Sequence, residues 1–122
     1  MEKATGLRRV INAAKYSMLG FKSAIKNETA FRQEVILLVI ACIIAFVIDF
    51  SIYERILLVG SIGVVMIVEL LNSAIECVVD RISTDHHELS GRAKDYGSAA
   101  VFVSLVLTGI LWIYLFACHF FP

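Results

Sequence analysis

Three long apolar segments dominate the chain, and short polar segments separate them. The clearest runs over about residues 96–121 and has no Asp, Glu, Lys or Arg. About 20 apolar residues in a helix are enough to cross a bilayer, so this segment predicts a transmembrane helix. We predict two further spans over about residues 30–48 and 56–80. The first is long enough only if the side chains of Arg32 and Glu34 extend toward the membrane surface.

A different pattern covers residues 6–26, where apolar residues recur at spacings of three and four. These apolar positions are Leu7, Val10, Ile11, Ala14, Met18, Phe21 and Ile25. Basic side chains occupy the remaining surface, at Arg8, Arg9, Lys15, Lys22 and Lys26. Such a helix lies in the membrane interface, with its apolar face toward hydrocarbon and its cations toward anionic headgroups. We expect an amphipathic surface helix that serves as an anchor, or also as the floor of a lipid-binding site.

The polar connections between these segments are short. Residues 27–34 predict a break before the first span, and residues 49–55 predict a loop before the second. Residues 81–95 form the longest polar segment, in which Ser90-Gly91 indicates a helix break.

Composition agrees with a membrane protein. The 122-residue chain is 59% hydrophobic, and its mean hydropathy is +0.82. A soluble domain of this length seldom reaches such values. The expected fold class is therefore all-α integral membrane, with three transmembrane helices and one surface helix in a single domain over residues 1–122.

Charge is distributed unevenly, although the formal net charge is zero. Most of the 11 Lys and Arg residues lie in the first 32 residues, at Lys3, Arg8, Arg9, Lys15, Lys22, Lys26 and Arg32. No basic patch recurs later, so we expect a membrane surface and no nucleic acid as partner. Cytoplasmic segments carry the excess of Lys and Arg. This rule predicts a cytoplasmic N-terminus, an outer loop at 49–55, a cytoplasmic segment at 81–95 and a periplasmic C-terminus.

The second span carries polar residues along one face. At about 100° per residue, four of them fall in one narrow stripe, namely Glu69, Asn72, Glu76 and Asp80. A carboxylate in hydrocarbon costs several kcal/mol, so such residues usually face a bundle interior or a cavity. A hydrogen-bonding seam between helices would explain the stripe. We favour a functional site, because three acids and an amide exceed what a seam needs.

Transfer of a phosphoryl group from a nucleotide to a lipid hydroxyl would use these groups. The reaction needs a divalent cation held by carboxylates, a positive charge near the phosphoryl group and a base for the hydroxyl. Glu28 and Glu76 are candidates for holding the cation. Lys94 is a candidate for the positive charge, and the deeper Glu69 for the base. Asn72, between the two acids of the stripe, is spaced to orient either.

Other functions fit the same residues. A small channel or proton-handling protein would line a cavity with Glu69 and Glu76, and a non-enzymatic bundle would use them as polar seams. The chain contains neither G-x-x-x-x-G-K-[ST] nor G-x-G-x-x-G. A kinase with this sequence would therefore not be built like the soluble ones.

Two longer motifs narrow the choice. They are ELLNSAIE at residues 69–76 and HELSGRAKDYGSAAV at residues 87–101. Together with AAKYSMLG and NETAFRQE nearer the N-terminus, they resemble the integral-membrane diacylglycerol kinase family of bacteria. The resemblance spans nearly the whole chain and is loosest in the lipid-facing parts of the first and third spans. Met18 stands where an aromatic residue often follows Tyr-Ser in that family.

The resemblance implies a homotrimer with sites at subunit boundaries, ATP as co-substrate and Mg²⁺ as cofactor. It implies an enzyme that returns diacylglycerol to phosphatidate in the bacterial inner membrane. Glu69 would be the general base, and Glu28 and Glu76 the metal ligands. The residues implied in ATP binding are Tyr16, Glu28, Glu76, Asp85, His86, His87, Lys94 and Asp95. Those implied in lipid-substrate binding are Arg9, Ala13, Ala14, Ser17, Met18, Ala30, Phe31, Glu34, Arg55, Glu69 and Ser98. Asn72 and Asp80 would support the site.

Two alternatives stay open at this point. One branch of the same family phosphorylates undecaprenol, although the long amphipathic N-terminal helix favours diacylglycerol. The second alternative is a non-enzymatic membrane helical bundle or pore.

Overall fold

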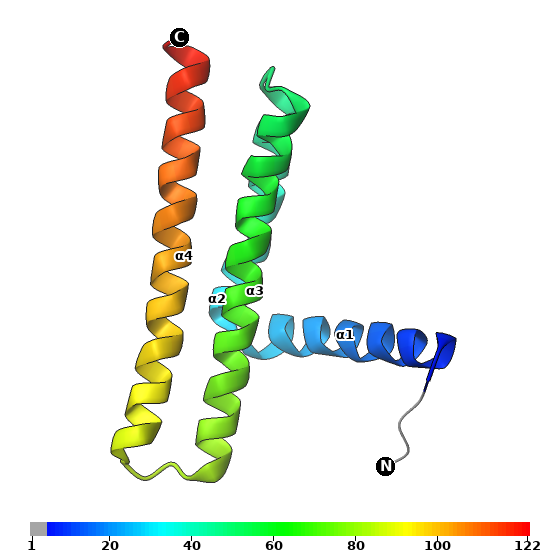
Figure 1. Cartoon of the computed structure of the whole chain (residues 1–122), viewed down its shortest axis with the longest axis vertical. Coiled ribbons are helices and arrows are strands. Elements are labelled where there is room, and N and C mark those ends of the chain that lie inside the picture. Colours follow the sequence, from blue (N-terminus) through cyan, green and yellow to red (C-terminus); the bar gives the residue numbers. More distant parts are fainter. Residues whose placement is uncertain (1–4) are drawn as a thin grey trace.

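The computed structural model describes residues 5–122, and Lys3 of the basic N-terminal segment lies outside this range. Helices account for the regular structure of the described residues, and they are α1 Leu7–Asn27, α2 Thr29–Val47, α3 Ile52–Ile82 and α4 Glu88–Phe120. Helices α2, α3 and α4 run lengthwise, with α3 packed against both others, whereas α1 extends sideways from them (Figure 1). The all-α fold expected from the sequence is confirmed.

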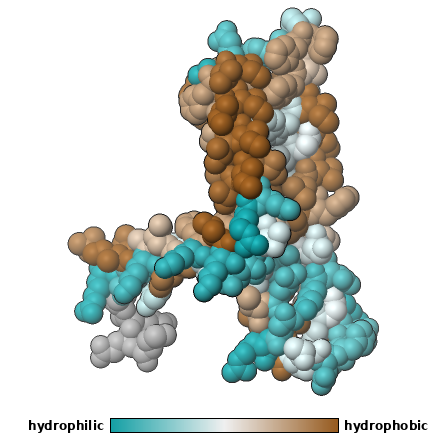
Figure 2. All heavy atoms as spheres, turned by 180° about the vertical axis from the view of Figure 1, so that it is seen from behind, coloured by the Kyte–Doolittle hydropathy of each residue, from teal (hydrophilic) through white to brown (hydrophobic). Residues whose placement is uncertain are grey.

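Three of these helices, α2, α3 and α4, are long and apolar enough to cross a membrane, which confirms the three expected spans. At about 1.5 Å per residue, the 19 residues of α2 cover about 28 Å. The 31 residues of α3 and the 33 of α4 cover about 46 and 50 Å. Because the hydrocarbon layer is about 30 Å thick, α3 and α4 extend beyond it. Hydrophilic residues surround their ends beside the α3–α4 connection, which identifies the end that leaves the hydrocarbon (Figure 2).

Fewer residues separate consecutive helices along the chain than the sequence predicts. Glu28 alone separates α1 from α2, so the expected break over residues 27–34 is wrong beyond this point. Its backbone N–H donates to Ala24 O at 2.9 Å and so completes the last turn of α1. Its own backbone is extended, with φ −112° and ψ 108°, which ends α1 and turns the chain into α2. Helix α3 begins at Ile52 because Ser51 and Glu54 form a capping box.

The helix break expected at Ser90-Gly91 is wrong, because α4 begins at Glu88 and continues through both residues. His87 caps this helix, since its Nδ1 accepts the backbone N–H of Leu89 at 3.1 Å. A pair between Glu88 and Arg92 at 2.7 Å spans the first turn. These local contacts outweigh the helix-weakening effect of a single glycine.

Arg32 holds the elbow between α1 and α2. Its Nη1 donates to the carbonyl oxygens of Ile25 at 2.9 Å and Lys26 at 3.0 Å, in the last turn of α1. Its Nη2 donates to Thr29 Oγ1 at 3.1 Å. The side chain thus satisfies helix-end carbonyls that have no intrahelical partner. Arg32 therefore has a structural role at the elbow, which the sequence did not predict.

Replacing Arg32 by alanine should loosen this elbow. The side chain is exposed, so we expect a loss of about 1 kcal/mol, below the range for buried charged hydrogen bonds. Amide hydrogen exchange in residues 24–32 should become about fivefold faster. Lys22→Ala, which removes an exposed cation of α1 that donates no hydrogen bond within residues 5–122, is the matched control. Unchanged exchange in Arg32→Ala would mean that other contacts hold the elbow.

Apolar residues pack together at the end of the long helices where α2 connects to α3 and α4 ends. Phe50, Leu58 and Leu115 are buried together there. Trp112 of α4 donates from Nε1 to Ser61 Oγ of α3 at 3.0 Å. This end is a fixed contact between helices, and the polar site described next lies toward the other end.

Candidate functional site

Carboxylates from three parts of the chain converge near the middle of α3. Glu69 of α3 and Glu34 of α2 are buried, with 7% and 6% of their surface exposed. Glu69 lies within electrostatic range of Glu34, of Glu28 at the α1–α2 junction and of Glu76 one heptad further along α3. Glu34 does not extend toward the membrane surface, and its Oε2 is enclosed without a hydrogen-bond partner. The described residues therefore bring the four acids to one region.

Asn72 occupies the same face of α3 as Glu69 and Glu76. It is buried with 8% of its surface exposed, and its Oδ1 is enclosed without a partner among the described residues. The side chain packs directly on Gly97 of α4, since a Cβ built there would overlap Asn72 Oδ1. This contact joins the carboxylate region to α4.

A polar pocket of about 250 Å³ lies at the end where α3 and α4 are connected. Its lining comprises Val79, Asp80, Ser83, Thr84, Asp85, His86, His87, Ser90, Gly91 and Lys94. Lys94 Nζ contacts Asp80 Oδ1 at 2.7 Å, with 43% and 56% of the two side chains exposed. Lys94 also lies within electrostatic range of Glu76. The pocket thus brings together four of the eight residues predicted to bind nucleotide, namely Asp85, His86, His87 and Lys94, and it adjoins the carboxylate region.

The oxygen-rich donor set suits a hard divalent cation such as Mg²⁺, which prefers carboxylates, waters and phosphate oxygens. Within residues 5–122 of one chain, no three His, Cys, Asp or Glu side chains are grouped closely enough to hold a metal. Glu28 and Glu76 are both only partly buried, so they have room for further ligands. Two carboxylates with phosphate and water ligands form the kind of site in which proteins usually hold Mg²⁺.

Several predicted site residues do not join this group in the single chain. Those on α1 are exposed, and α1 itself extends sideways from the three long helices (Figure 1); they are Arg9, Ala13, Ala14, Tyr16, Ser17 and Met18. Asp95 and Ser98 are exposed on α4, and Ala30 is exposed on α2. Phe31, by contrast, is buried, three residues before Glu34.

Arg55 lies at the far end of the long helices, away from Glu69. Its Nε donates to Ala45 O at 2.8 Å and its Nη2 to Ile48 O at 3.4 Å, at the end of α2. The guanidinium also lies 5.6 Å from the ring centroid of Phe46. These contacts indicate a structural role for Arg55 within the single chain, and a lipid contact there would be separate from the carboxylate region.

Two residues that shape the site were not predicted from the sequence to do so. Arg32 fixes the elbow beside Glu28, and the signal for this role was its position four residues after the junction. Gly97 leaves the space that the Asn72 side chain occupies. The sequence feature that could have indicated this role was the position of Gly97 in the longer family-like motif. Neither signal identified the partner, because both contacts join different helices.

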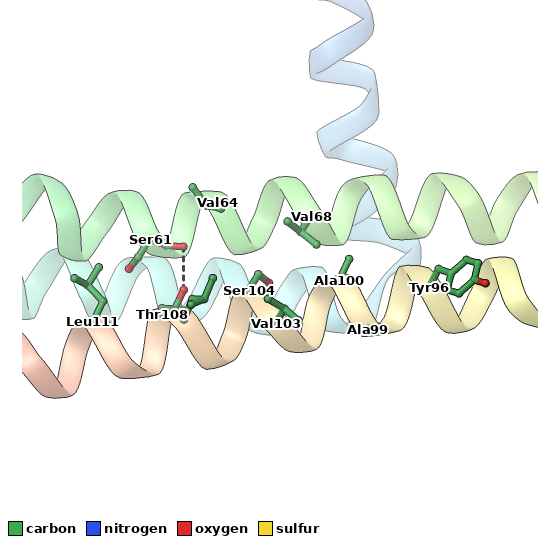
Figure 3. A pocket seen from close by; sticks show the side chains of 11 residues that line it. Ser61, Val64, Val68, Tyr96, Ala99, Ala100, Val103, Ser104, Thr108 and Leu111 are labelled. Atoms are coloured by element: carbon green, nitrogen blue, oxygen red, sulfur yellow. Dashed lines mark hydrogen bonds between the residues drawn. The ribbon is translucent and has the colours of Figure 1, made fainter.

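An apolar groove of about 730 Å³ runs between α3 and α4 (Figure 3). Val64 and Val68 line it from α3, and Tyr96 and Val103 from α4. A hydrogen bond from Thr108 Oγ1 to the backbone oxygen of Ser61, at 3.4 Å, crosses its far part. The groove lies among the apolar parts of two membrane-spanning helices and carries no acid.

Comparisons with known proteins agree with these features. A family model described as prokaryotic diacylglycerol kinase matches residues 15–116. The chain is 55% identical over 112 residues to the diacylglycerol kinase of Haemophilus influenzae, covering 92% of this chain and 95% of that protein. It is 52% identical over 116 residues to that of Escherichia coli K12, covering 95% of each. It is 50% identical over 108 residues to that of Pseudomonas aeruginosa, covering 88% of each.

The family model includes the whole of α2 and α3 and most of α4. It also includes both long motifs that carry the carboxylate region and the polar pocket. The match therefore extends over the helices that build the candidate site, and the chain belongs to the prokaryotic diacylglycerol kinase family.

Proposed function

We propose that this protein transfers the γ-phosphoryl group of ATP to the hydroxyl of diacylglycerol and releases phosphatidate and ADP. The observation that carries the proposal is the buried Glu69 among carboxylates, beside a polar pocket that contains Lys94. A lipid hydroxyl and a water-soluble nucleotide have to meet at the membrane boundary, and this site lies where the long helices leave the hydrocarbon. The names of the relatives support the same reaction.

The residues of the chain have distinct roles in this reaction. The hydroxyl oxygen of diacylglycerol forms a bond to the γ-phosphorus, and the bond from that phosphorus to the β–γ bridging oxygen breaks. Glu69 accepts the hydroxyl proton, as a general base must lie within hydrogen-bond reach of that proton. Lys94 stabilises the negative charge that spreads over the phosphoryl oxygens and the leaving ADP.

Glu28 and Glu76 would hold Mg²⁺ together with the phosphates. The bound ion supplies positive charge that neutralises the β- and γ-phosphate oxygens. Asp80 keeps Lys94 in place through their 2.7 Å contact. The nucleotide base and ribose would lie near Asp85, His86 and His87, which line the same pocket.

Assembly as a homotrimer would complete the site. Helix α1 extends sideways from the helices that carry the carboxylates, and its predicted site residues are exposed, so a neighbouring subunit would contribute them (Figure 1). In this arrangement α1 lies on the inner membrane surface. Figure 2 supports it, since hydrophobic residues gather along one side of α1 and hydrophilic residues along the other. The N-terminus would be cytoplasmic and the C-terminus periplasmic.

The test is ATP consumption by the purified protein in lipid–detergent micelles with Mg²⁺. Parallel reactions contain diacylglycerol, undecaprenol or neither lipid. We expect turnover that depends on diacylglycerol. Turnover mainly with undecaprenol would keep the mechanism and change the substrate, and no turnover from folded protein would contradict the kinase proposal.

Replacing Glu76 by glutamine tests the metal site. Loss of an anionic ligand should raise the Mg²⁺ concentration for half-maximal rate by at least about tenfold, since even outer partners of a metal contribute about 10–100-fold to its affinity. Glu88→Gln is the matched control, because Glu88 is an exposed acid at the same end and pairs only with Arg92 within the described residues. An unchanged Mg²⁺ dependence in Glu76→Gln would exclude Glu76 as a ligand.

A further inference from the structure

Gly97 lies at an unusually close crossing of α3 and α4. All seven glycines of the chain are in the described part, and at the other six an added Cβ would meet nothing within 4 Å. At Gly97 the added Cβ would overlap Asn72 Oδ1, and it would lie 3.2 Å from Asn72 Cγ and 3.7 Å from Asn72 Cβ. The conflict therefore involves the carboxamide of Asn72, whereas its Cβ is at an ordinary contact distance.

The Asn72 carboxamide is held in a costly environment. Its oxygen is enclosed and has no hydrogen-bond donor among the described residues. Leaving a buried acceptor unpaired costs about 1–3 kcal/mol. Gly97 offers only a Cα–H group at this point, which is at best a weak donor. An apolar side chain would pack here at lower cost, so stability alone does not account for an asparagine.

The contact also selects which end of the amide is presented to the site. A carboxamide has an acceptor oxygen and a donor amino group on opposite sides of one plane. The oxygen faces Gly97 of α4, where it is enclosed and has no partner. The amino group is not an enclosed atom of this kind. Asn72 lies three residues after Glu69 and four before Glu76, on the same helix face. Its free end is therefore a donor, suited to a carboxylate or a phosphoryl oxygen.

We propose that Gly97 is a positioning residue, which seats the Asn72 oxygen against α4 and so directs the Asn72 amino group to the reacting region. The inference rests on the proposed phosphoryl transfer and adds a residue to it. With any larger residue at position 97, the amide has to rotate or withdraw. A displacement of about 1 Å at a reacting group can cost about 100-fold in rate.

A packing role alone makes different predictions. If Gly97 only lets two helices approach, Gly97→Ala lowers stability and leaves the turnover number of the folded protein unchanged. If it positions Asn72, Gly97→Ala lowers kcat by about 10- to 100-fold, with the KM for ATP within about twofold of wild type. Gly109→Ala is the matched control, because Gly109 is in the same helix and its added Cβ would meet nothing within 4 Å.

The decisive measurement is a double-mutant cycle of kcat with Asn72→Ala. The two alanines fit together, since the Cβ positions are 3.7 Å apart, so the double variant should fold. We expect Gly97→Ala, Asn72→Ala and the double variant to share one reduced kcat. Reductions that multiply in the double variant, or a normal kcat in Gly97→Ala, would overturn the proposal.

A second variant covers the case in which Gly97→Ala does not fold. Asn72→Asp keeps the shape and replaces the amino donor by an acceptor, so its kcat should fall at least as far as that of Asn72→Ala. Full turnover in Asn72→Asp, or a tighter Mg²⁺ response, would show that an oxygen is the group required and would overturn the proposal. Diacylglycerol-dependent turnover by the wild-type protein, measured alongside, tests the proposed function separately.

Discussion

Replacing Glu69 by glutamine should reduce diacylglycerol-dependent ATP turnover by about 10²- to 10⁴-fold, the range that general base catalysis contributes. Glutamine has nearly the same shape, but its amide cannot accept the hydroxyl proton. Glu69 is buried, and three neighbouring carboxylates lie within electrostatic range, so removing its charge also relieves repulsion. The variant should therefore fold and assemble at least as well as the wild-type protein.

The measurement is initial rate at saturating ATP, Mg²⁺ and diacylglycerol, with assembly checked by size in detergent. Glu69→Asp keeps the charge and shortens the side chain by one methylene, so it should retain more activity than Glu69→Gln. Near-normal turnover in Glu69→Gln would remove Glu69 as the base. Loss of assembly together with loss of turnover would favour a structural seam.

Replacing Lys94 by methionine should lower kcat by about 10²- to 10³-fold, the typical loss when one stabilising group for transition-state charge is removed. Methionine keeps much of the length of the side chain and its apolar stem. The lysine is partly exposed, so its removal should leave folding nearly unchanged. The rate of ATP consumption with diacylglycerol measures the effect.

Asp80→Asn is the informative control for Lys94. It breaks the 2.7 Å contact but keeps the lysine, so its loss of rate should be much smaller. Equal losses in the two variants would indicate that the ion pair, and not the cation, is what the reaction needs. Normal turnover in Lys94→Met would exclude its role at the phosphates.

Patterns within one helix were readable from the sequence. The three spans follow from length and hydropathy, and helical periodicity places Glu69 and Asn72 together on a face that is indeed buried. Helix ends were harder to predict, because they depend on single hydrogen bonds. The cap provided by His87 carries α4 through Ser90-Gly91, where the residue types indicated a break.

Contacts between helices were the least predictable part of the site. Arg32 and Glu34 both looked like residues that reach for the membrane surface. The structure turns Arg32 to the end of α1 and buries Glu34 near Glu69. The relative rotation of two helices is set by packing, and no periodicity within either segment reports it. The placement of α1 residues against a neighbouring subunit stays a prediction for the same reason.

The elbow at Glu28 makes this family member more sensitive to insertions and deletions than to substitutions. One non-helical residue joins α1 to α2, so the rotation of α1 about its own axis is tied to that of α2. Adding or removing one residue in the last turn of α1 would rotate everything before it by about 100°. If α1 lies on the membrane surface as proposed, its apolar side would then face sideways and its basic side chains would enter hydrocarbon. The number of residues between Leu7 and Thr29 is thus constrained more tightly than the identity of most of them.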